Sequence, residues 1–226
     1  MTAMNMDTPD KSNGGIDERA YQTYLDHLLK GSRRECSKIV ADHLADQVPV
    51  KTLYEGMFRR SLYRVGELWE HNRISVAVEH MATAITEGLM NDVYGRLISG
   101  RRADRRVVVS SIEGEFHQVG GKMAADLFEM HGWDAYYLGA NTPSADLIRA
   151  IRDIRPHVVG LSLSIYFHID TLRETIARVR AADGDVRILV GGQAFRHGGL
   201  RRITELPGVT YAGSLNTLER YIRSRE

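Results

Sequence analysis

The sequence predicts an α/β protein, in which a bundle of four helices precedes a parallel sheet covered by helices on both faces. From about Ile16 to Ser99, apolar residues recur with helical periodicity and Pro49 is the one proline. After Arg106, short β-branched or aromatic runs alternate with helical stretches, which is typical of right-handed βαβ units. We therefore expect a helical-bundle cap domain over residues 16–99 and a sheet domain over residues 106–226.

The helices of the first part are expected at about 17–30, after Ser32, at about 50–70 and after Ser75. Gly31 is a typical helix terminator, and the two serines are expected to cap the helices that follow them. Short connections between the helices favour an antiparallel bundle. The polar, charged residues 100–106 are interpreted as a linker.

Five strands are expected in the second part, at residues 107–111, 135–138, 157–163, 186–190 and 209–212. Helical periodicity occupies residues 121–130, 144–154, 171–182 and 215–223. The segment after Gly192 has no clear pattern.

Composition limits the function. The formal net charge of +1 predicts no general attraction to nucleic acid or anionic lipid. The single cysteine, Cys36, excludes an intramolecular disulfide, and no apolar run is as long as a membrane span. Residues 1–15 are polar and lack the apolar core of a signal peptide. We expect them to form a disordered lead-in and the protein to be cytoplasmic.

His117 is the candidate metal ligand. It lies in a run from Glu113 to Gly121, directly after the apolar residues 107–109. A loop at the carboxyl end of a parallel strand is where open α/β sheets bind ligands. Neutral imidazole is also the commonest metal ligand among side chains.

Other uses of this loop fit less well. Gly114 and Gly120 are six residues apart, so the loop is not a dinucleotide fingerprint. Phe116 and Met123 stand where a phosphate-binding P-loop needs glycine and a hydroxyl residue. No G-x-S-x-G elbow supports nucleophilic hydrolysis, and scattered histidines with one cysteine do not match a zinc site.

The run Glu115-x-His117-x-x-Gly120 resembles the D-x-H-x-x-G motif of cobalamin-binding domains, with Glu in place of Asp. The resemblance implies a Rossmann-like (flavodoxin-like) domain in which His117 is the lower axial ligand of cobalt. Glu115 is the expected partner of the second imidazole nitrogen, because metal-bound histidines usually donate that N–H to a carboxylate, a carbonyl or water.

Two further segments support the same resemblance. Ser162-Leu163-Ser164 stands where the family has S-x-L, and Gly191-Gly192 stands where it has two glycines. In that family these small residues make room for the nucleotide tail of the corrinoid, so Ser162, Ser164, Gly191 and Gly192 are implied cofactor-binding residues. Gly191-Gly192 could also form an ordinary turn.

The helical part is similar to CarH-type cobalamin photoreceptors, which bind adenosylcobalamin in the dark. Trp69 is followed after nine residues by Glu79-His80, as in their W-x9-E-H pattern, and Val76 falls where they have valine. Helical spacing places Val76, Glu79 and His80 on one side of the last helix. The resemblance implies that the corrinoid lies between the two domains, with these four residues on its upper face. Alternatively, Trp69 packs in the core and His80 is a buried structural histidine.

Two departures from the photoreceptors affect the expected function. Their N-terminal winged-helix DNA-binding domain is not found in this sequence, and Glu70 stands where they have a second histidine. We therefore expect a light-responsive sensor without enzymatic activity and without direct binding to nucleic acid or membrane. Its output would pass through a protein partner or a homo-oligomer. Adenosylcobalamin is the expected cofactor, and methylcobalamin is the alternative form. The alternative functions are a corrinoid methyl carrier for a methyltransferase, and a sensor of haem or a bilin.

Overall fold

The computed structural model describes residues 15–98, 100 and 102–225. The predicted lead-in, apart from Gly15, lies outside these residues. The chain divides into two compact units, Met1–Asp92 and Val93–Glu226.

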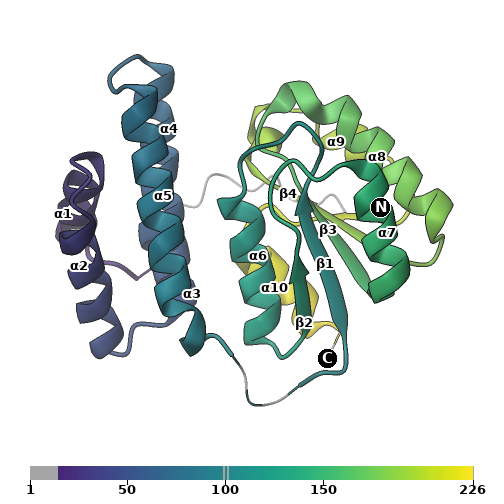
Figure 1. The fold of residues 1–226 in the computed structure, drawn as a ribbon, viewed down its shortest axis with the longest axis horizontal. Coiled ribbons are helices and arrows are strands. Elements are labelled where there is room, and N and C mark those ends of the chain that lie inside the picture. The colour runs from purple at the N-terminus through teal and green to yellow at the C-terminus, as the bar shows by residue number, and fades with distance from the viewer. Residues whose placement is uncertain (1–14, 99, 101, 226) are drawn as a thin grey trace, which may run out of the picture. The chain divides into compact units, whose positions relative to one another are not determined.

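The first unit is helical (Figure 1). Its elements are α1 (Glu18–Leu29), α2 (Arg33–Ala45), α3 (Val50–Leu53), the π-helical segment η1 (Tyr54–Arg59), α4 (Arg60–Glu70) and α5 (Val76–Val93). The segments α3, η1 and α4 follow one another without a break and form the predicted third helix. The π-helical turns inside it were not predicted. Large side chains fill the core of this unit, including Tyr24, Leu53, Tyr54, Met57 and Phe58.

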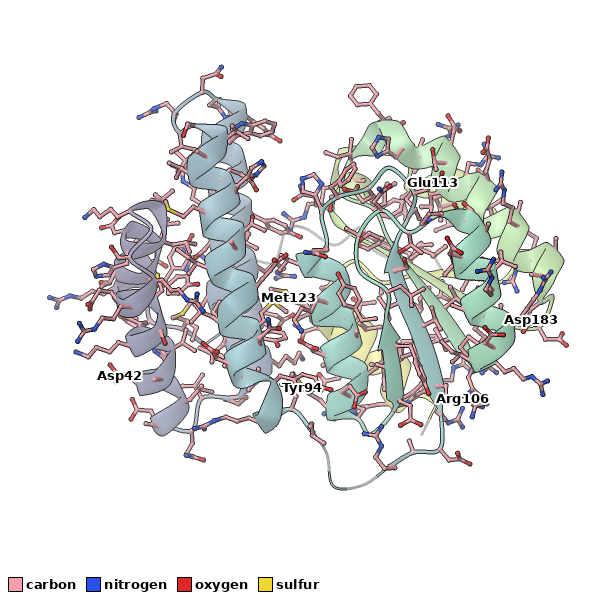
Figure 2. The ribbon with its side chains drawn as sticks, in the orientation of Figure 1. Asp42, Tyr94, Arg106, Glu113, Met123 and Asp183 are labelled. Atoms are coloured by element: carbon pink, nitrogen blue, oxygen red, sulfur yellow. The ribbon has the colours of Figure 1, made fainter. Side chains whose placement is uncertain are left out.

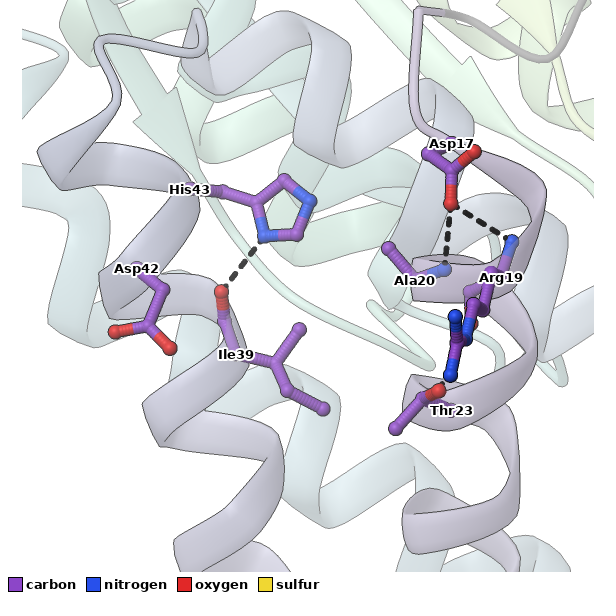
Figure 3. Close-up of a pocket in the computed structure, with 7 residues that line it drawn as sticks. All are labelled: Asp17, Arg19, Ala20, Thr23, Ile39, Asp42 and His43. Atoms are coloured by element: carbon purple, nitrogen blue, oxygen red, sulfur yellow. Dashed lines mark hydrogen bonds between the residues drawn. The ribbon is translucent and has the colours of Figure 1, made fainter.

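Of the two predicted caps, Ser75 makes a capping bond and Ser32 does not, and Asp17 caps α1 without having been predicted. The carboxylate of Asp17 accepts hydrogen bonds from the backbone N–H groups of Arg19 and Ala20 and caps α1 (Figure 3). Ser75 accepts one from the N–H of Val78. The prediction for Ser32 was wrong, because its side chain makes no capping bond to α2. A pocket at α1 and α2 is lined by Asp17, Arg19, Ala20, Thr23, Ile39, Asp42 and His43 (Figure 3).

The second unit is built on a five-stranded parallel sheet with the order β2-β1-β3-β4-β5. The strands are β1 (Arg106–Ser111), β2 (Asp134–Tyr137), β3 (Val158–Ser162), β4 (Arg187–Gly191) and β5 (Val209–Tyr211). All five predicted strands are present, with shifts of one residue at most of their ends. The chain leaves β1 toward β2 on one side and returns to β3 on the other, so the strand order reverses between β1 and β3. Open α/β sheets bind ligands at this position.

Helices cover both faces of this sheet (Figure 1). The helices α6 (Val119–Met130) and α10 (Leu215–Arg223) pack together, as do α7 (Ser144–Ile154) and α8 (Ile169–Ala182). The segment after Gly192 forms a 3-10 turn, η4 (Gln193–His197), and a short helix, α9 (Leu200–Thr204). Two more 3-10 turns are η2 (Tyr94–Arg96) and η3 (Tyr166–His168). Within the described part of the chain, none of the helices combines the length and apolar character needed to cross a membrane.

Candidate cofactor site

The His117 loop connects β1 to α6 at the position where the strand order reverses. It begins at Ile112, and the next residue, Glu113, is labelled in Figure 2. At the same sheet edge, Ser111 pairs in register with Ser162, and Ser162 pairs with Gly191. Three neighbouring strands therefore end in small residues beside this loop.

Glu115 is the centre of the loop. Its side chain is fully buried. One carboxylate oxygen, Oε1, lies 2.5 Å from Nδ1 of His117 and accepts the backbone N–H of the same residue at 3.0 Å. The other oxygen, Oε2, accepts the backbone N–H groups of Ser164 and Ile165 at 2.8 and 2.9 Å. One carboxylate thus ties the imidazole to the loop that follows β3.

These contacts fix the ionisation state of Glu115. Burial alone would raise the pKa of this carboxyl group, but the hydrogen bonds from the side chain and backbone of His117, and from two further backbone N–H groups, lower it to about 2. An ionised carboxylate only accepts hydrogen bonds, so Nδ1 of His117 carries the proton. A metal would then be bound through Nε2. The expected carboxylate–histidine pair is present. The Glu115 side chain, which is longer than the Asp of the family motif, reaches Nδ1 of His117.

The imidazole itself is accessible, since 51% of the His117 side chain is exposed. Its backbone is held by Ser111, whose hydroxyl donates to the carbonyl oxygen of His117 at 3.0 Å. The hydroxyl of Tyr137 donates to the carbonyl oxygen of Gln118 at 2.6 Å. We did not single out Ser111 or Tyr137 from the sequence. The available signal was their place at the ends of two predicted strands.

Gly120, Gly191 and Gly192 differ in the space around the Cβ atom that a larger residue would add. A Cβ atom added at Gly120 would meet only the Ser162 hydroxyl, at 3.9 Å, so this position offers space that the fold does not need. At Gly191 it would lie 3.0 Å from the carbonyl oxygen of Ala212. Gly192 has a φ of +112°, and a Cβ atom there would lie 2.0 Å from the carbonyl oxygen of Leu163. Gly192 is therefore required by the backbone, whereas the fold would accept a side chain at Gly120.

This part of the site fits a corrinoid. The donor set at the sheet edge is one accessible imidazole with a carboxylate behind it, which is the usual support of a metal-bound histidine. At Gly120 an added Cβ atom would meet only the Ser162 hydroxyl within 4 Å, so no side chain of the protein fills this position. The backbone N–H of Ser164 serves a different purpose, because it binds Glu115 and so fixes the loop.

The remaining predicted residues lie in the helical unit, at the turn between α4 and α5. Trp69 is 46% exposed and Val76 is 50% exposed, so neither is a core residue. Oε2 of Glu79 lies 2.6 Å from Nδ1 of His80, and Oε1 of Glu79 accepts a hydrogen bond from the hydroxyl of Thr83 at 3.1 Å. The His80 side chain is 74% exposed, so it is not a buried structural histidine. This turn thus presents two apolar side chains and one hydrogen-bonded acid–imidazole pair.

Comparison with known families decides the class of the protein. Two models, each described as a B12 binding domain, match residues 105–212 and residues 20–92. The chain belongs to the B12-binding domain family. This B12-binding protein therefore binds cobalamin, and the match covers both its helical and its sheet unit.

Individual relatives fall into two groups. The chain is 28% identical over 158 residues to the HTH-type transcriptional repressor CarH of Myxococcus xanthus, covering 70% of this chain and 52% of that protein. It thus spans about half the length of that relative. It is 23% identical over 163 residues to trimethylamine corrinoid protein 1 of Methanosarcina mazei, covering 69% of this chain and 74% of that protein.

Among solved structures, the monomethylamine corrinoid protein of Methanosarcina barkeri has the same fold. The TM-score is 0.79 at 12% sequence identity, and the alignment covers 93% of this chain and all of that one. The predicted fold class, a helical bundle followed by a Rossmann-like cobalamin-binding sheet domain, is confirmed.

Proposed function

We propose that this B12-binding protein is a light-responsive sensor that uses adenosylcobalamin and acts through a protein partner or a change of oligomeric state. The observation that carries the proposal is the surface at the α4–α5 turn. It combines the half-exposed side chains of Trp69 and Val76 with the Glu79–His80 pair. Large apolar side chains left in water commonly mark binding surfaces. The similarity to CarH supports the assignment of this surface to the adenosyl group.

Each residue at the sheet edge would have a separate role in holding the cofactor. His117 ligates cobalt through Nε2, and Glu115 holds the imidazole in the required tautomer and orientation. Gly120 and Ser162 would give room to the nucleotide tail, and Gly191 packs against the carbonyl oxygen of Ala212 at the adjoining strand end. Adenosylcobalamin, when bound, supplies a cobalt–carbon bond that visible light can break.

The upper residues would respond to that event. Trp69 and Val76 contact the adenosyl group by apolar surface, and the Glu79–His80 pair supplies hydrogen bonds. Without the adenosyl group these contacts at the α4–α5 turn would be missing, and the helical unit would serve as the two-state element that a switch requires. A ligand can shift such an equilibrium only by its differential affinity for the two states.

The test is spectral and hydrodynamic. The full chain is loaded with adenosylcobalamin in darkness, and its absorption spectrum and elution volume are recorded before and after green light. We expect a light-dependent change in the spectrum together with a change in assembly or in partner binding. A protein that retains no corrinoid, or whose spectrum and assembly are the same in both conditions, would contradict the proposal.

The lower ligand is tested by His117→Ala. Because half of this side chain is exposed, we expect the variant to fold and to lose the nitrogen ligand from the cobalt spectrum, with weaker corrinoid retention. The matched control is His43→Ala in the helical unit, whose Nδ1 contacts only the carbonyl oxygen of Ile39 among the bonds described here. A spectrum and an affinity equal to those of the unchanged protein would remove His117 from the site.

A second function has specific support. The fold similarity to the monomethylamine corrinoid protein covers nearly the whole chain, and a trimethylamine corrinoid protein is among its relatives. We therefore keep a corrinoid methyl carrier as the alternative. A methylcobalamin form that is stable in light and transfers its methyl group rapidly to a methyltransferase would favour the carrier over the sensor. A haem or bilin would be recognised at once from the absorbance of the protein as purified.

A further inference from the structure

Asn141 holds the His117 loop on the side of β2. It lies in the segment that connects β2 to α7. Its side-chain oxygen Oδ1 accepts the backbone N–H of Gly114 at 2.8 Å. Its own backbone N–H donates to the carbonyl oxygen of Glu115, also at 2.8 Å. A single residue thus binds the peptide groups on both sides of the Gly114–Glu115 step.

The loop is fastened at neighbouring points by the same segment. Glu113 accepts the backbone N–H and the hydroxyl of Ser144, at the first turn of α7. The backbone N–H of Ser111 donates to the carbonyl oxygen of Gly139. Directly after Glu113 comes Gly114, whose φ of +81° is a conformation that glycine adopts at little cost and can also leave easily. Asn141 supplies the one side-chain contact described at that glycine.

In addition to the bond from its own N–H to the carbonyl oxygen of Ile112, Glu115 is held from two directions. Its carboxylate is bound by the loop after β3, through the backbone N–H groups of Ser164 and Ile165. Its backbone carbonyl is bound by Asn141. The direction of the carboxylate determines where the imidazole of His117 points, since the two groups lie 2.5 Å apart. Any rotation of the Gly114–Glu115 peptide would move that carboxylate.

We propose that Asn141 is a positioning residue for the metal ligand: it binds the N–H of Gly114 and the carbonyl oxygen of Glu115, on either side of the Gly114–Glu115 peptide, and thereby keeps His117 in its ligating orientation. The inference rests on the proposed ligation of cobalt by His117 and adds a residue that touches neither the metal nor the imidazole.

Asparagine suits this task for two reasons. Its φ is +49°, in the left-handed region that Asn, Asp and Gly tolerate better than other residues. Its side chain also supplies the acceptor for the Gly114 N–H. Glycine would keep the backbone conformation and lose the acceptor, whereas aspartate would keep both. The pair Asn141→Gly and Asn141→Asp therefore separates the side-chain bond from the backbone conformation.

Gln47→Gly is the matched control. Gln47 is exposed, lies after α2 in the helical unit and has a φ of +61°, so glycine there relieves the same kind of backbone conformation away from the sheet edge. Asn141 is exposed as well, so its replacement leaves no buried cavity. All three variants are expected to fold.

Two measurements are made on the full chain. In the cofactor-free protein, amide hydrogen exchange is followed in the segment 113–118. In protein labelled with heavy nitrogen, loaded with cobalamin and reduced to cobalt(II), electron paramagnetic resonance reports the nitrogen splitting from a bound imidazole and separates it from that of the cofactor's own base. For Asn141→Gly we expect exchange to be about two- to tenfold faster and the histidine-ligated fraction to fall by a similar factor, as the loss of one hydrogen bond predicts. Asn141→Asp and Gln47→Gly should match the unchanged protein in both measurements.

The outcomes distinguish the two proposals. If the unchanged protein binds cobalamin without nitrogen splitting, the ligation by His117 is wrong. If it shows the splitting and Asn141→Gly shows the same splitting and the same exchange, the role of Asn141 is wrong. Because the histidine-ligated fraction is a ratio within the loaded protein, a lower yield of folded Asn141→Gly does not affect the result.

Discussion

The two glycines Gly120 and Gly192 should respond in opposite ways to the same substitution, alanine. At Gly192, φ is +112° and ψ is 167°, a region that costs a residue with a Cβ atom about 1–3 kcal/mol. The new Cβ atom would also lie 2.0 Å from the carbonyl oxygen of Leu163, which already accepts the backbone N–H of Ala194. Relieving such an overlap costs about 1–3 kcal/mol more.

Gly192→Ala should therefore lower the free energy of unfolding by about 2–6 kcal/mol, a large share of the roughly 5–15 kcal/mol of a typical domain. At Gly120 the Cβ atom meets only an ordinary contact at 3.9 Å, and alanine in a helix is favoured over glycine by about 0.5–1 kcal/mol. Gly120→Ala should leave the stability unchanged or slightly higher. Because its methyl group occupies the proposed tail position, it should weaken cobalamin binding by about tenfold, within the cost of overpacking.

The assay has two parts, urea unfolding of the cofactor-free protein followed by circular dichroism, and titration with cobalamin in darkness. The reasoning would be refuted by a Gly192→Ala variant as stable as the unchanged protein. It would equally be refuted by a Gly120→Ala variant that loses stability and binds cobalamin normally.

Three more predictions follow from burial and charge. The pKa of Glu115 is lowered from its ordinary value of 4.5 to about 2, since its hydrogen bonds outweigh burial; its contribution to stability is therefore complete above about pH 4.5 and is lost as the pH falls toward 2. Acid titration of unfolding should show this loss, and Glu115→Gln should reduce it. Burial raises the pKa of the Cys36 thiol to about 11, so a thiol reagent at pH 8 should label it only as the protein unfolds, whereas immediate labelling would contradict its burial. Trp69→Ala should cost less than about 1 kcal/mol of stability because the indole is half exposed, but should impair retention of adenosylcobalamin; equal retention would assign Trp69 to packing alone.

The architecture was predictable because each sheet strand has a short apolar run and each helix a periodic one. Strand ends shifted by a residue where polar residues such as Arg106 and Asp134 still pair in the sheet. The segment after Gly192 was not predictable, since a 3-10 turn has no strong hydrophobic period. The motif around His117 was readable from its spacing and from the resemblance that it carries.

The support of His117 was less predictable. The bonds from Ser164 and Ile165 to Glu115 use backbone N–H groups, which every residue but proline possesses, so side-chain identity gives no signal for them. Asn141 contacts a loop far away in the sequence, and only the parallel pairing of β1 and β2 brings the two together. Long-range backbone contacts of this kind follow from topology rather than from local sequence.

The π-helical segment Tyr54–Arg59 has a geometric consequence for Trp69. Bonds from residue i to i+5 take up more residues per turn than an α-helix does, so each such turn shifts the rotational phase of everything after it. One residue in an α-helix corresponds to about 100° around the axis. The rotational phase that this segment sets places Ser61 and Val65 on the buried side of α4 and directs Trp69 outward. The direction of the Trp69 indole therefore depends on the number of residues in the π-helical segment before it. Deleting one residue from that segment would redirect Trp69 and leave the W-x9-E-H spacing intact.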